Sequence, residues 1–408
     1  MNRAFKILIA AVFINLCVGV LYAWSVISRA LVNQMGWSNA EAGLPYTIAV
    51  VTFALGVLAA GNLQDRMGPQ KLVITGVGMV GLGMLASSMA TTPFALLMTF
   101  GVLVGTGIGF AYACLSPTAM KWFHPSKKGM VNGLIAGGFG MAPLYLAPLS
   151  SALILSMGVS ATFMALGVAV LVIGLPLAFT IVTPPAGYQP EVPAGYNEPA
   201  GKAASRNFTW REMVRTRQFY LMWIAFAFAS SAGLMLIGNI TSIASIQGNK
   251  TDVAYLVSLL AVANTLGRIL MGMLSDKIGR TPTLLLAVAM QTANMLMFPY
   301  YTGEAGFIAG AIVAGVSYGA LLSVFPSMTA DYFGIKNYGS NFGVLYLAWG
   351  ASGFMGPVMA GIVVDATGGY GLAYSISAVM LAIAGAAAFF TKPVNVDELE
   401  QKGILKAA

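Results

Sequence analysis

Hydrophobic residues fall in long blocks that are separated by short polar breaks along the whole chain. A helix of about 20 apolar residues crosses the hydrocarbon core of a bilayer, so blocks of this length predict membrane spans. The breaks delimit twelve predicted spans, at residues 5–32, 41–63, 69–90, 94–120, 129–155, 161–183, 219–246, 252–275, 281–302, 305–330, 340–364 and 370–391. The sequence therefore predicts an all-α membrane protein with twelve transmembrane helices.

One polar interruption, at residues 184–216, is much longer than the others. It is proline-rich at its start and basic at its end, as is typical of a linker between domains. Six predicted spans precede it and six follow it. We therefore expect an N-terminal six-helix bundle at 1–183, a cytoplasmic linker at 184–216, a C-terminal six-helix bundle at 217–392 and a cytoplasmic tail at 393–408.

The composition and the charge distribution support a membrane protein. Of the 408 residues, 58% are hydrophobic and 8% are charged, whereas about 25% are charged in an ordinary soluble domain. The net charge is +8, but the basic residues do not form a patch with interleaved aromatics, so we expect no nucleic-acid partner. With both termini inside, eighteen basic residues lie in inner segments and only Arg29 and Lys250 in outer ones. The positive-inside rule favours this orientation.

Residues that could carry catalysis or hold a metal are scarce. The two cysteines, Cys17 and Cys114, lie in apolar stretches, and His124, the one histidine, lies in a basic turn. All thirteen acidic residues lie at span ends, in loops or in the tails. Neither a metal cluster nor a pair of carboxylates can therefore form inside the spans, and we expect no enzyme, no metal and no cofactor.

Arg268 is the one basic residue that lies well inside a predicted span, roughly 10 Å from the cytoplasmic end at 1.5 Å per residue. An arginine at that depth is costly unless it faces a wet cavity or meets an anion, and it cannot lose its proton. Asn264, Thr265, Gly272 and Ser275 share its helix face. We interpret Arg268 as the binding group for a transported carboxylate, which its guanidinium would hold bidentately. The alternative is an arginine that snorkels to the interface or binds backbone carbonyls.

The two halves of the chain contain similar motifs. The segment 61–68 and the segment 272–279 share the pattern G-x-L-x-D-[RK]-x-G, at an offset of 211 residues. Trp122-Phe123 with Gly129 and Tyr332-Phe333 with Gly339 repeat at an offset of 210. This spacing predicts a parallel internal repeat of two six-helix bundles.

The loop motif, its second copy and the six-plus-six layout resemble the major facilitator superfamily. Within it, further motifs resemble the branch of oxalate/formate antiporters and monocarboxylate transporters, in particular the bacterial lactate-type ones. These motifs are Tyr22-Ala-Trp24-Ser25, the turn from Lys121 to Gly129, Asn264-x-x-x-Arg268, Ser317-Tyr318, Phe325-Pro326 and Asp331-x-Phe333-Gly334. The resemblance implies an integral protein of a bacterial inner membrane with both termini in the cytoplasm.

The resemblance also implies roles for individual residues. Family members bind the substrate carboxylate through an arginine at the place of Arg268, and Asn264 would bind the substrate or Arg268. Counterparts of Tyr22, Tyr112, Phe139 and Tyr318 line the central cavity of the oxalate exchanger. Tyr145, Tyr346 and Trp349 are weaker candidates for the substrate wall, and any one aromatic residue could equally be a packing residue.

Three positions depart from the family pattern. Oxalate exchangers have a second cation where this chain has Trp349, and a single cation suits a monocarboxylate better than a dicarboxylate. Animal-type monocarboxylate transporters have an aspartate and a lysine, implicated in proton coupling, where this chain has Asn264 and Val26. If protons move, we expect the substrate carboxylate, alone or with Arg268, to carry the change in charge.

The repeated loop motif predicts a gate at the cytoplasmic ends of spans two and eight. Asp65 and Asp276 can each accept hydrogen bonds from the start of a neighbouring helix and hold the inner gate shut. The basic residues of this predicted gate are Arg66, Lys277 and Arg280. Ordinary positive-inside anchoring is the alternative role of these basic residues.

The sequence thus predicts a secondary active transporter of small, lactate-like monocarboxylates, coupled to protons and working by alternating access between the two bundles. An anion exchanger of the oxalate/formate type is one alternative, and a carboxylate sensor that does not transport is another. The expected partners are a monocarboxylate anion, a proton and the lipid bilayer, with no obligatory protein partner.

Overall fold

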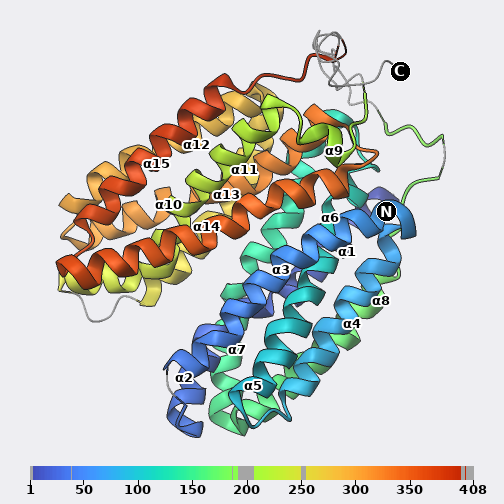
Figure 1. Cartoon of the computed structure of the whole chain (residues 1–408). Coiled ribbons are helices and arrows are strands. Elements are labelled where there is room, and N and C mark those ends of the chain that lie inside the picture. Colours follow the sequence, from blue (N-terminus) through green and yellow to red (C-terminus); the bar gives the residue numbers. More distant parts are fainter. Residues whose placement is uncertain are drawn as a thin grey trace. The chain divides into compact units, whose positions relative to one another are not determined.

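The computed structural model describes residues 3–37, 39–185, 187–191, 206–249, 254–396 and 400, and within these ranges the ordered elements are helices (Figure 1). The chain divides into two compact units, Met1–His124 with Gly138–Glu191 and Pro125–Gly137 with Val192–Ala408. The first ten residues of α7 thus group with the second unit. The predicted bundle and linker bounds, 183 and 217, stay a prediction.

The first unit contains the helices of the first half of the chain. They are α1 (Arg3–Val18), α2 (Trp24–Met35), α3 (Asn39–Met67), α4 (Pro69–Ser87), α5 (Pro93–Leu96), α6 (Gly105–Met120), α8 (Leu175–Ala178) and, from Gly138 on, α7 (Lys128–Ala169). Gly19–Ala23 is a 3₁₀ turn between α1 and α2, and two π-helical turns, Leu97–Val104 and Val170–Gly174, join α5 to α6 and α7 to α8.

The second unit contains the helices that follow the linker. They are α9 (Trp210–Met213), α10 (Arg217–Gly248), α11 (Ala254–Ile278), α12 (Arg280–Met297), α13 (Glu304–Phe333), α14 (Tyr338–Thr367) and α15 (Gly371–Phe390). The short 3₁₀ turns Pro125–Lys127 and Phe298–Tyr300 precede α7 and follow α12.

Eleven helical segments within the described ranges are long and apolar enough to cross a membrane. One of them, Pro125–Ala178, has 54 residues; it contains the predicted span 129–155 and most of the predicted span 161–183. It breaks at Gly158, whose φ of +81° lies in the left-handed region that glycine adopts without strain. The expected all-α, twelve-span architecture is confirmed, with spans five and six joined by a single glycine.

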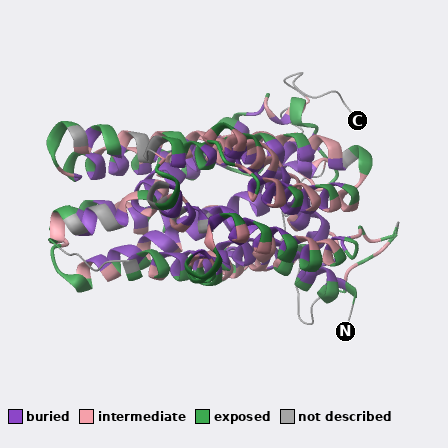
Figure 2. Cartoon of the chain, turned by 90° about the horizontal axis from the view of Figure 1, so that it is seen from below, coloured by how far each residue is buried: buried purple, intermediate pink, exposed green. Residues whose placement is uncertain are grey.

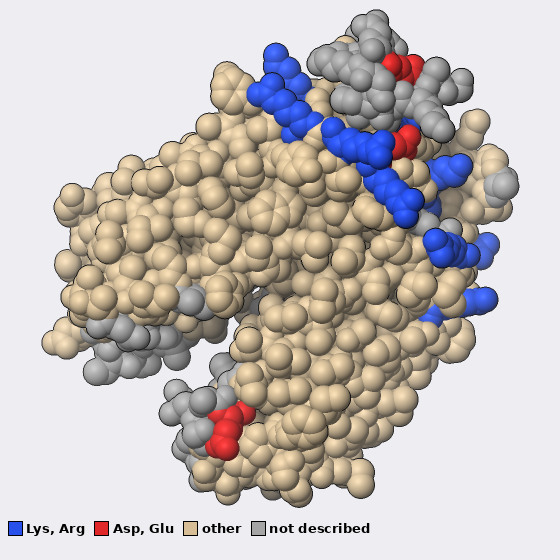
Figure 3. All heavy atoms as spheres, viewed as in Figure 1, with Lys and Arg blue, Asp and Glu red and all other residues tan. Residues whose placement is uncertain are grey.

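Burial within each unit follows the pattern of a lipid-embedded bundle. Figure 2 shows buried positions on the sides of helices that face other helices, and exposed positions on the outer sides. Large apolar residues such as Met89, Leu155 and Phe354 are exposed. In each unit the Lys and Arg side chains that are visible in Figure 3 gather at one end. This surface is stable where hydrocarbon, rather than water, covers the apolar part.

The end of the linker packs on the second unit. Phe208 is fully buried, and its backbone N–H donates to the carbonyl of Phe333 at 2.9 Å. Thr209 and Glu212 form a capping box that begins α9. Arg206 pairs with Glu212 at 3.1 Å. Burial alone would raise the pKa of Glu212, but the hydrogen bonds from Thr209 and the charge of Arg206 lower it below its usual range.

Candidate functional site

The start of α7 lies in close contact with α11 and α13, and we call this contact region the α7 seam. Glycines at positions 129, 133 and 137 recur every fourth residue, so they share one face of α7. A side chain on Gly129 would meet the backbone of Gly272, and one on Gly133 would meet the carbonyl of Arg268. Small residues at this spacing let two helix backbones approach closely in a membrane.

Arg268 lies on α11 at the α7 seam and is among the most completely buried side chains, at 1% exposure. Its Nε donates to Oδ1 of Asn264 at 3.1 Å, and its Nη1 donates to the backbone carbonyl of Ala136 on α7 at 2.5 Å. Both acceptors are neutral. No carboxylate among the described residues forms an ion pair with this guanidinium.

Helix α13 fixes the backbone around Arg268. A Cβ on Gly319 of α13 would lie 2.8 Å from the backbone nitrogen of Arg268, and one on Gly315 would lie 2.8 Å from that of Asn264. The helices α11 and α13 are therefore in backbone contact at the level of the arginine. This contact fixes the backbone of Arg268, while its guanidinium reaches α7.

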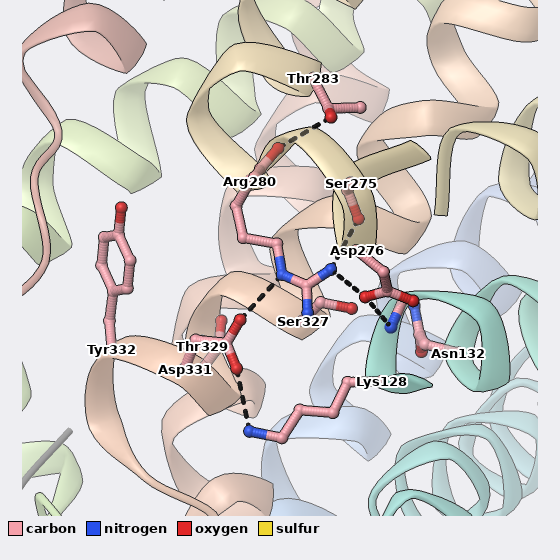
Figure 4. Close-up of polar contacts among 12 residues, drawn as sticks. Lys128, Asn132, Ser275, Asp276, Arg280, Thr283, Ser327, Thr329, Asp331 and Tyr332 are labelled. Carbon is pink, nitrogen blue, oxygen red and sulfur yellow. Dashed lines mark hydrogen bonds and ion pairs between the residues drawn. The ribbon is translucent and has the colours of Figure 1, made fainter. Parts of the chain in front are cut away.

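A network of charged side chains surrounds the first turn of α7 (Figure 4). Asp276 accepts hydrogen bonds from the backbone N–H groups of Gly129 and Met130, each at 2.9 Å, and from Nη1 of Arg280. The α7 N-terminus carries unsatisfied donors and partial positive charge, so a carboxylate stabilises it. This is the geometry that the sequence predicts for Asp276. Its gating role stays a prediction.

A second carboxylate completes the network. Asp331 of α13 pairs with Nζ of Lys128 at 2.9 Å and with Nε of Arg280 at 2.8 Å. Arg280 also donates to the hydroxyl of Ser275 at 2.7 Å. We call Lys128, Asp276, Arg280 and Asp331 the charge network. Sequence reasoning did not assign Lys128 and Asp331 to the site, although both lie in motifs that carry the family resemblance.

Three predicted aromatic residues of the second unit come together. The indole N–H of Trp349 donates to the hydroxyl of Tyr318 at 2.7 Å. The rings of Tyr346 and Trp349 stack with their centroids 5.0 Å apart. Two phenylalanines extend this group, because Phe226 stacks on Phe325 at 4.3 Å and meets Tyr346 at 6.3 Å. The result is an aromatic wall without a charged group among its five members.

A separate aromatic cluster forms in the first unit. The rings of Tyr112 and Phe139 lie 5.4 Å apart, and Phe53 contacts both, at 5.5 and 5.9 Å. Sequence reasoning missed Phe53, which no motif marked. Tyr145 does not join this cluster: it is 40% exposed, and its hydroxyl donates to the carbonyl of Leu16.

Four further predicted site residues fall into two groups. The side chains of Tyr22 and Asp65 lie outside the described part of the structure. Arg66 and Lys277 are exposed at the ends of α3 and α11, which is also what simple positive-inside anchoring would give. Of the predicted gate residues, Asp276 and Arg280 are thus the two that the structure places in the network.

Residues 7–289 and, in an overlapping second match, residues 222–406 fit the Major Facilitator Superfamily, which accounts for nearly the whole chain. The chain belongs to the Major Facilitator Superfamily. It is 28% identical to the oxalate:formate antiporter of Oxalobacter formigenes, over 96% of this chain and 92% of that protein. It is 22% identical to monocarboxylate transporter 10 of Danio rerio, over 90% of this chain and 74% of that protein.

The fold of this superfamily member is also found among solved structures. A structure of the fucose:proton symporter FucP of E. coli matches with a TM-score of 0.72 and 16% identity, over 96% of this chain and all of that chain. Membership in the superfamily establishes an integral membrane transporter. Membership in this superfamily leaves the substrate and the driving ion to be inferred from the site.

Proposed function

We propose that this transporter carries small monocarboxylates such as lactate, and that Arg268 binds their carboxylate. The supporting observation is a fully buried guanidinium whose two hydrogen-bond acceptors are both neutral. Burial of an arginine in a membrane protein is costly unless an anion neutralises it. A carboxylate would neutralise the charge and match the two parallel N–H donors of the guanidinium.

Helix α7 explains how the arginine is kept buried between substrates. The Ala136 carbonyl occupies one donor of Arg268 when the α7 seam is closed. When α7 separates from α11, this donor becomes available, and the substrate carboxylate takes the place of the carbonyl. Asn264 remains bound to Nε on the same helix and orients the guanidinium in both states. Substrate binding and movement of α7 are then coupled, because the substrate carboxylate replaces the Ala136 carbonyl as an acceptor for Arg268.

The aromatic wall supports a substrate with one negative charge. Tyr318 and Trp349 present a phenol and an indole that are already hydrogen-bonded to each other. By the family resemblance, Trp349 occupies the place of the second cation of oxalate exchangers. A dicarboxylate would leave its second charge beside these neutral groups, whereas a short hydroxy acid would place an apolar or hydroxyl group there.

The proposed driving force is the proton gradient, with alternating access and both termini in the cytoplasm of a bacterial cell. Asn264 cannot titrate, so the proton would travel with the substrate carboxylate, alone or with Arg268. Proteoliposomes distinguish this from exchange: symport predicts uptake that follows an inward pH gradient. Uptake that is independent of the pH gradient and requires an internal anion would instead support an exchanger. The oxalate:formate antiporter, 28% identical to this chain, is a relative of that type. Absence of any flux would favour the sensor.

The direct test is thermal stabilisation of the purified protein by a panel of mono- and dicarboxylates. A ligand at a hundred times its Kd adds about 2.7 kcal/mol to the unfolding free energy. We expect lactate-like monocarboxylates to raise the melting temperature of the parent and of the matched control Arg215→Ala, an exposed arginine outside the site. Arg268→Ala and Arg268→Lys should lose this response. An equal response in all four proteins would remove Arg268 from the site.

A further inference from the structure

Helix α13 contains a proline in the part that packs on α7. Pro326 lies inside the helix Glu304–Phe333 and has no backbone N–H. The carbonyl four residues earlier, that of Leu322, therefore lacks the N–H that normally donates to it in an α-helix. Both residues are buried. A backbone carbonyl without a hydrogen bond is costly inside a membrane protein, so a neighbouring group must supply one.

Asn132 of α7 supplies that hydrogen bond. Its side-chain amide Nδ2 donates to the carbonyl of Leu322 at 3.2 Å and to the carbonyl of Ser323 at 3.1 Å. Asn132 is 2% exposed and is drawn beside the charge network in Figure 4. Its position on α7 is one turn from the network and one turn from Ala136, so it lies between the gate and the arginine along the α7 seam.

We propose that Asn132 and the proline-freed carbonyl of Leu322 form an uncharged latch that stabilises the closed α7 seam and so sets how often Arg268 becomes available. The latch rests on the proposed function only in its last step, the release of Arg268. When α7 leaves α13, Leu322 loses its donor and Asn132 loses its acceptor, and water must replace both. The closed state is therefore favoured by a bond that Pro326 makes necessary.

This latch differs from the charge network in what can weaken it. The network depends on the charges of ionised side chains, of which Asp331 is 26% exposed, so salt can screen it in part. The amide of Asn132 carries no charge and does not titrate, so the latch keeps its strength across ionic strength and pH. We infer that the seam retains a preference for closure even where the network is screened.

Hydrogen–deuterium exchange measures the latch without any substrate. The amides of Gly129 and Met130 donate to Asp276 in the closed seam, so their exchange reports its opening. We expect Asn132→Leu to speed exchange in the segment 128–137 by about tenfold, the effect of losing one buried hydrogen bond. Asn62→Leu is the matched control, because the amide of Asn62 donates to Leu58 in its own helix, and it should leave this segment unchanged.

The decisive variant is the double substitution Asn132→Leu with Pro326→Ala. Alanine at 326 restores the N–H that the helix needs at Leu322, so the double variant should exchange within about threefold of Pro326→Ala alone. A packing role of Asn132 would not be rescued in this way. If Asn132→Leu does not fold, Asn132→Ser is used instead, because serine also lacks the amide and is smaller than leucine. Pro326→Ala must then reduce the fast exchange of Asn132→Ser in the same way.

Two results would overturn the latch: unchanged exchange in the single variant, or a double variant that exchanges as fast as Asn132→Leu does. Both are measured without ligand, so they say nothing against monocarboxylate binding at Arg268. Conversely, monocarboxylates could fail to raise the melting temperature while the double variant still restores slow exchange. That combination would support the latch and contradict monocarboxylate binding at Arg268.

Discussion

Two arginines at the α7 seam lie twelve positions apart in the chain and have opposite surroundings. Arg280 contacts two carboxylates, those of Asp276 and Asp331, and is 9% exposed. Arg268 is buried more completely, and its acceptors among the described residues are an amide oxygen and a backbone carbonyl. The same cation is thus neutralised within the protein at one position and, among the described residues, not at the other. A paired arginine stabilises a fold, whereas an arginine with neutral acceptors can still gain from an incoming anion.

The largest expected effect comes from removing a carboxylate of the charge network. Asp331→Asn leaves Arg280 with one carboxylate and Lys128 with none, and breaking a buried charged pair on one side costs about 3 kcal/mol. We expect a melting temperature several degrees lower and faster exchange at Gly129. Lys336→Ala, an exposed lysine on the loop after α13, is the control. A stable Asp331→Asn protein with normal exchange would show that the network does not hold α7.

The next variant gives Arg268 a carboxylate partner, such as Arg280 already has. Asn264→Asp places a carboxylate at the position that now offers only an amide oxygen to Nε. The substrate must then compete with this internal anion, so its apparent affinity should fall about tenfold at neutral pH, or about 1.4 kcal/mol. Because protonation removes the competitor, affinity should recover as the pH falls towards the aspartate pKa.

Binding measured across pH for the parent, Asn264→Asp and Asn264→Ser separates charge from lost hydrogen bonding. The serine variant loses the amide and adds no charge, so its affinity should not recover on acidification. If the aspartate variant binds the monocarboxylate as tightly as the parent at neutral pH, a carboxylate at position 264 does not compete with the substrate for Arg268.

The smallest effect concerns a third arginine, in the linker. Arg206 and hydrogen bonds from Thr209 lower the pKa of Glu212, so this group stabilises the folded linker above the ordinary glutamate pKa. That contribution is lost as the pH falls through the lowered, folded-state pKa. The melting temperatures of the parent and Glu212→Gln should therefore differ slightly at neutral pH and converge in acid. A difference that grows on acidification would contradict this sign.

The fold was predictable because each span had to satisfy its backbone within one apolar helix. Block length therefore located the spans, including the two that Gly158 joins without a polar loop. Arg268 was predictable for a related reason, since a charge in the middle of an apolar block is conspicuous. Its neighbour Asn264 was predicted from the helical repeat, which places it on the face of Arg268, together with the family resemblance.

The partners supplied by α7 were not predictable in the same way. Ala136 contributes a backbone carbonyl, which no side-chain pattern reveals. Asn132 is one polar residue among others in a predicted span, and Pro326 is part of a motif that indicated only the family resemblance. Their connection, and that of Lys128 with Asp331, depends on segments about 190 to 200 positions apart in sequence. Local periodicity carries no information about such approaches.

The glycines at 129, 133 and 137 give α7 a face almost without side chains where it meets α11. Two surfaces with interlocking side chains separate only after many rotamers change. Here backbone lies on backbone, so parting requires few such changes and its free energy resides in a handful of identifiable hydrogen bonds. The carbonyl of Arg268 itself lies under Gly133. Displacement of α7 therefore changes the surroundings of Arg268 directly, with no chain of intermediate side chains to transmit it.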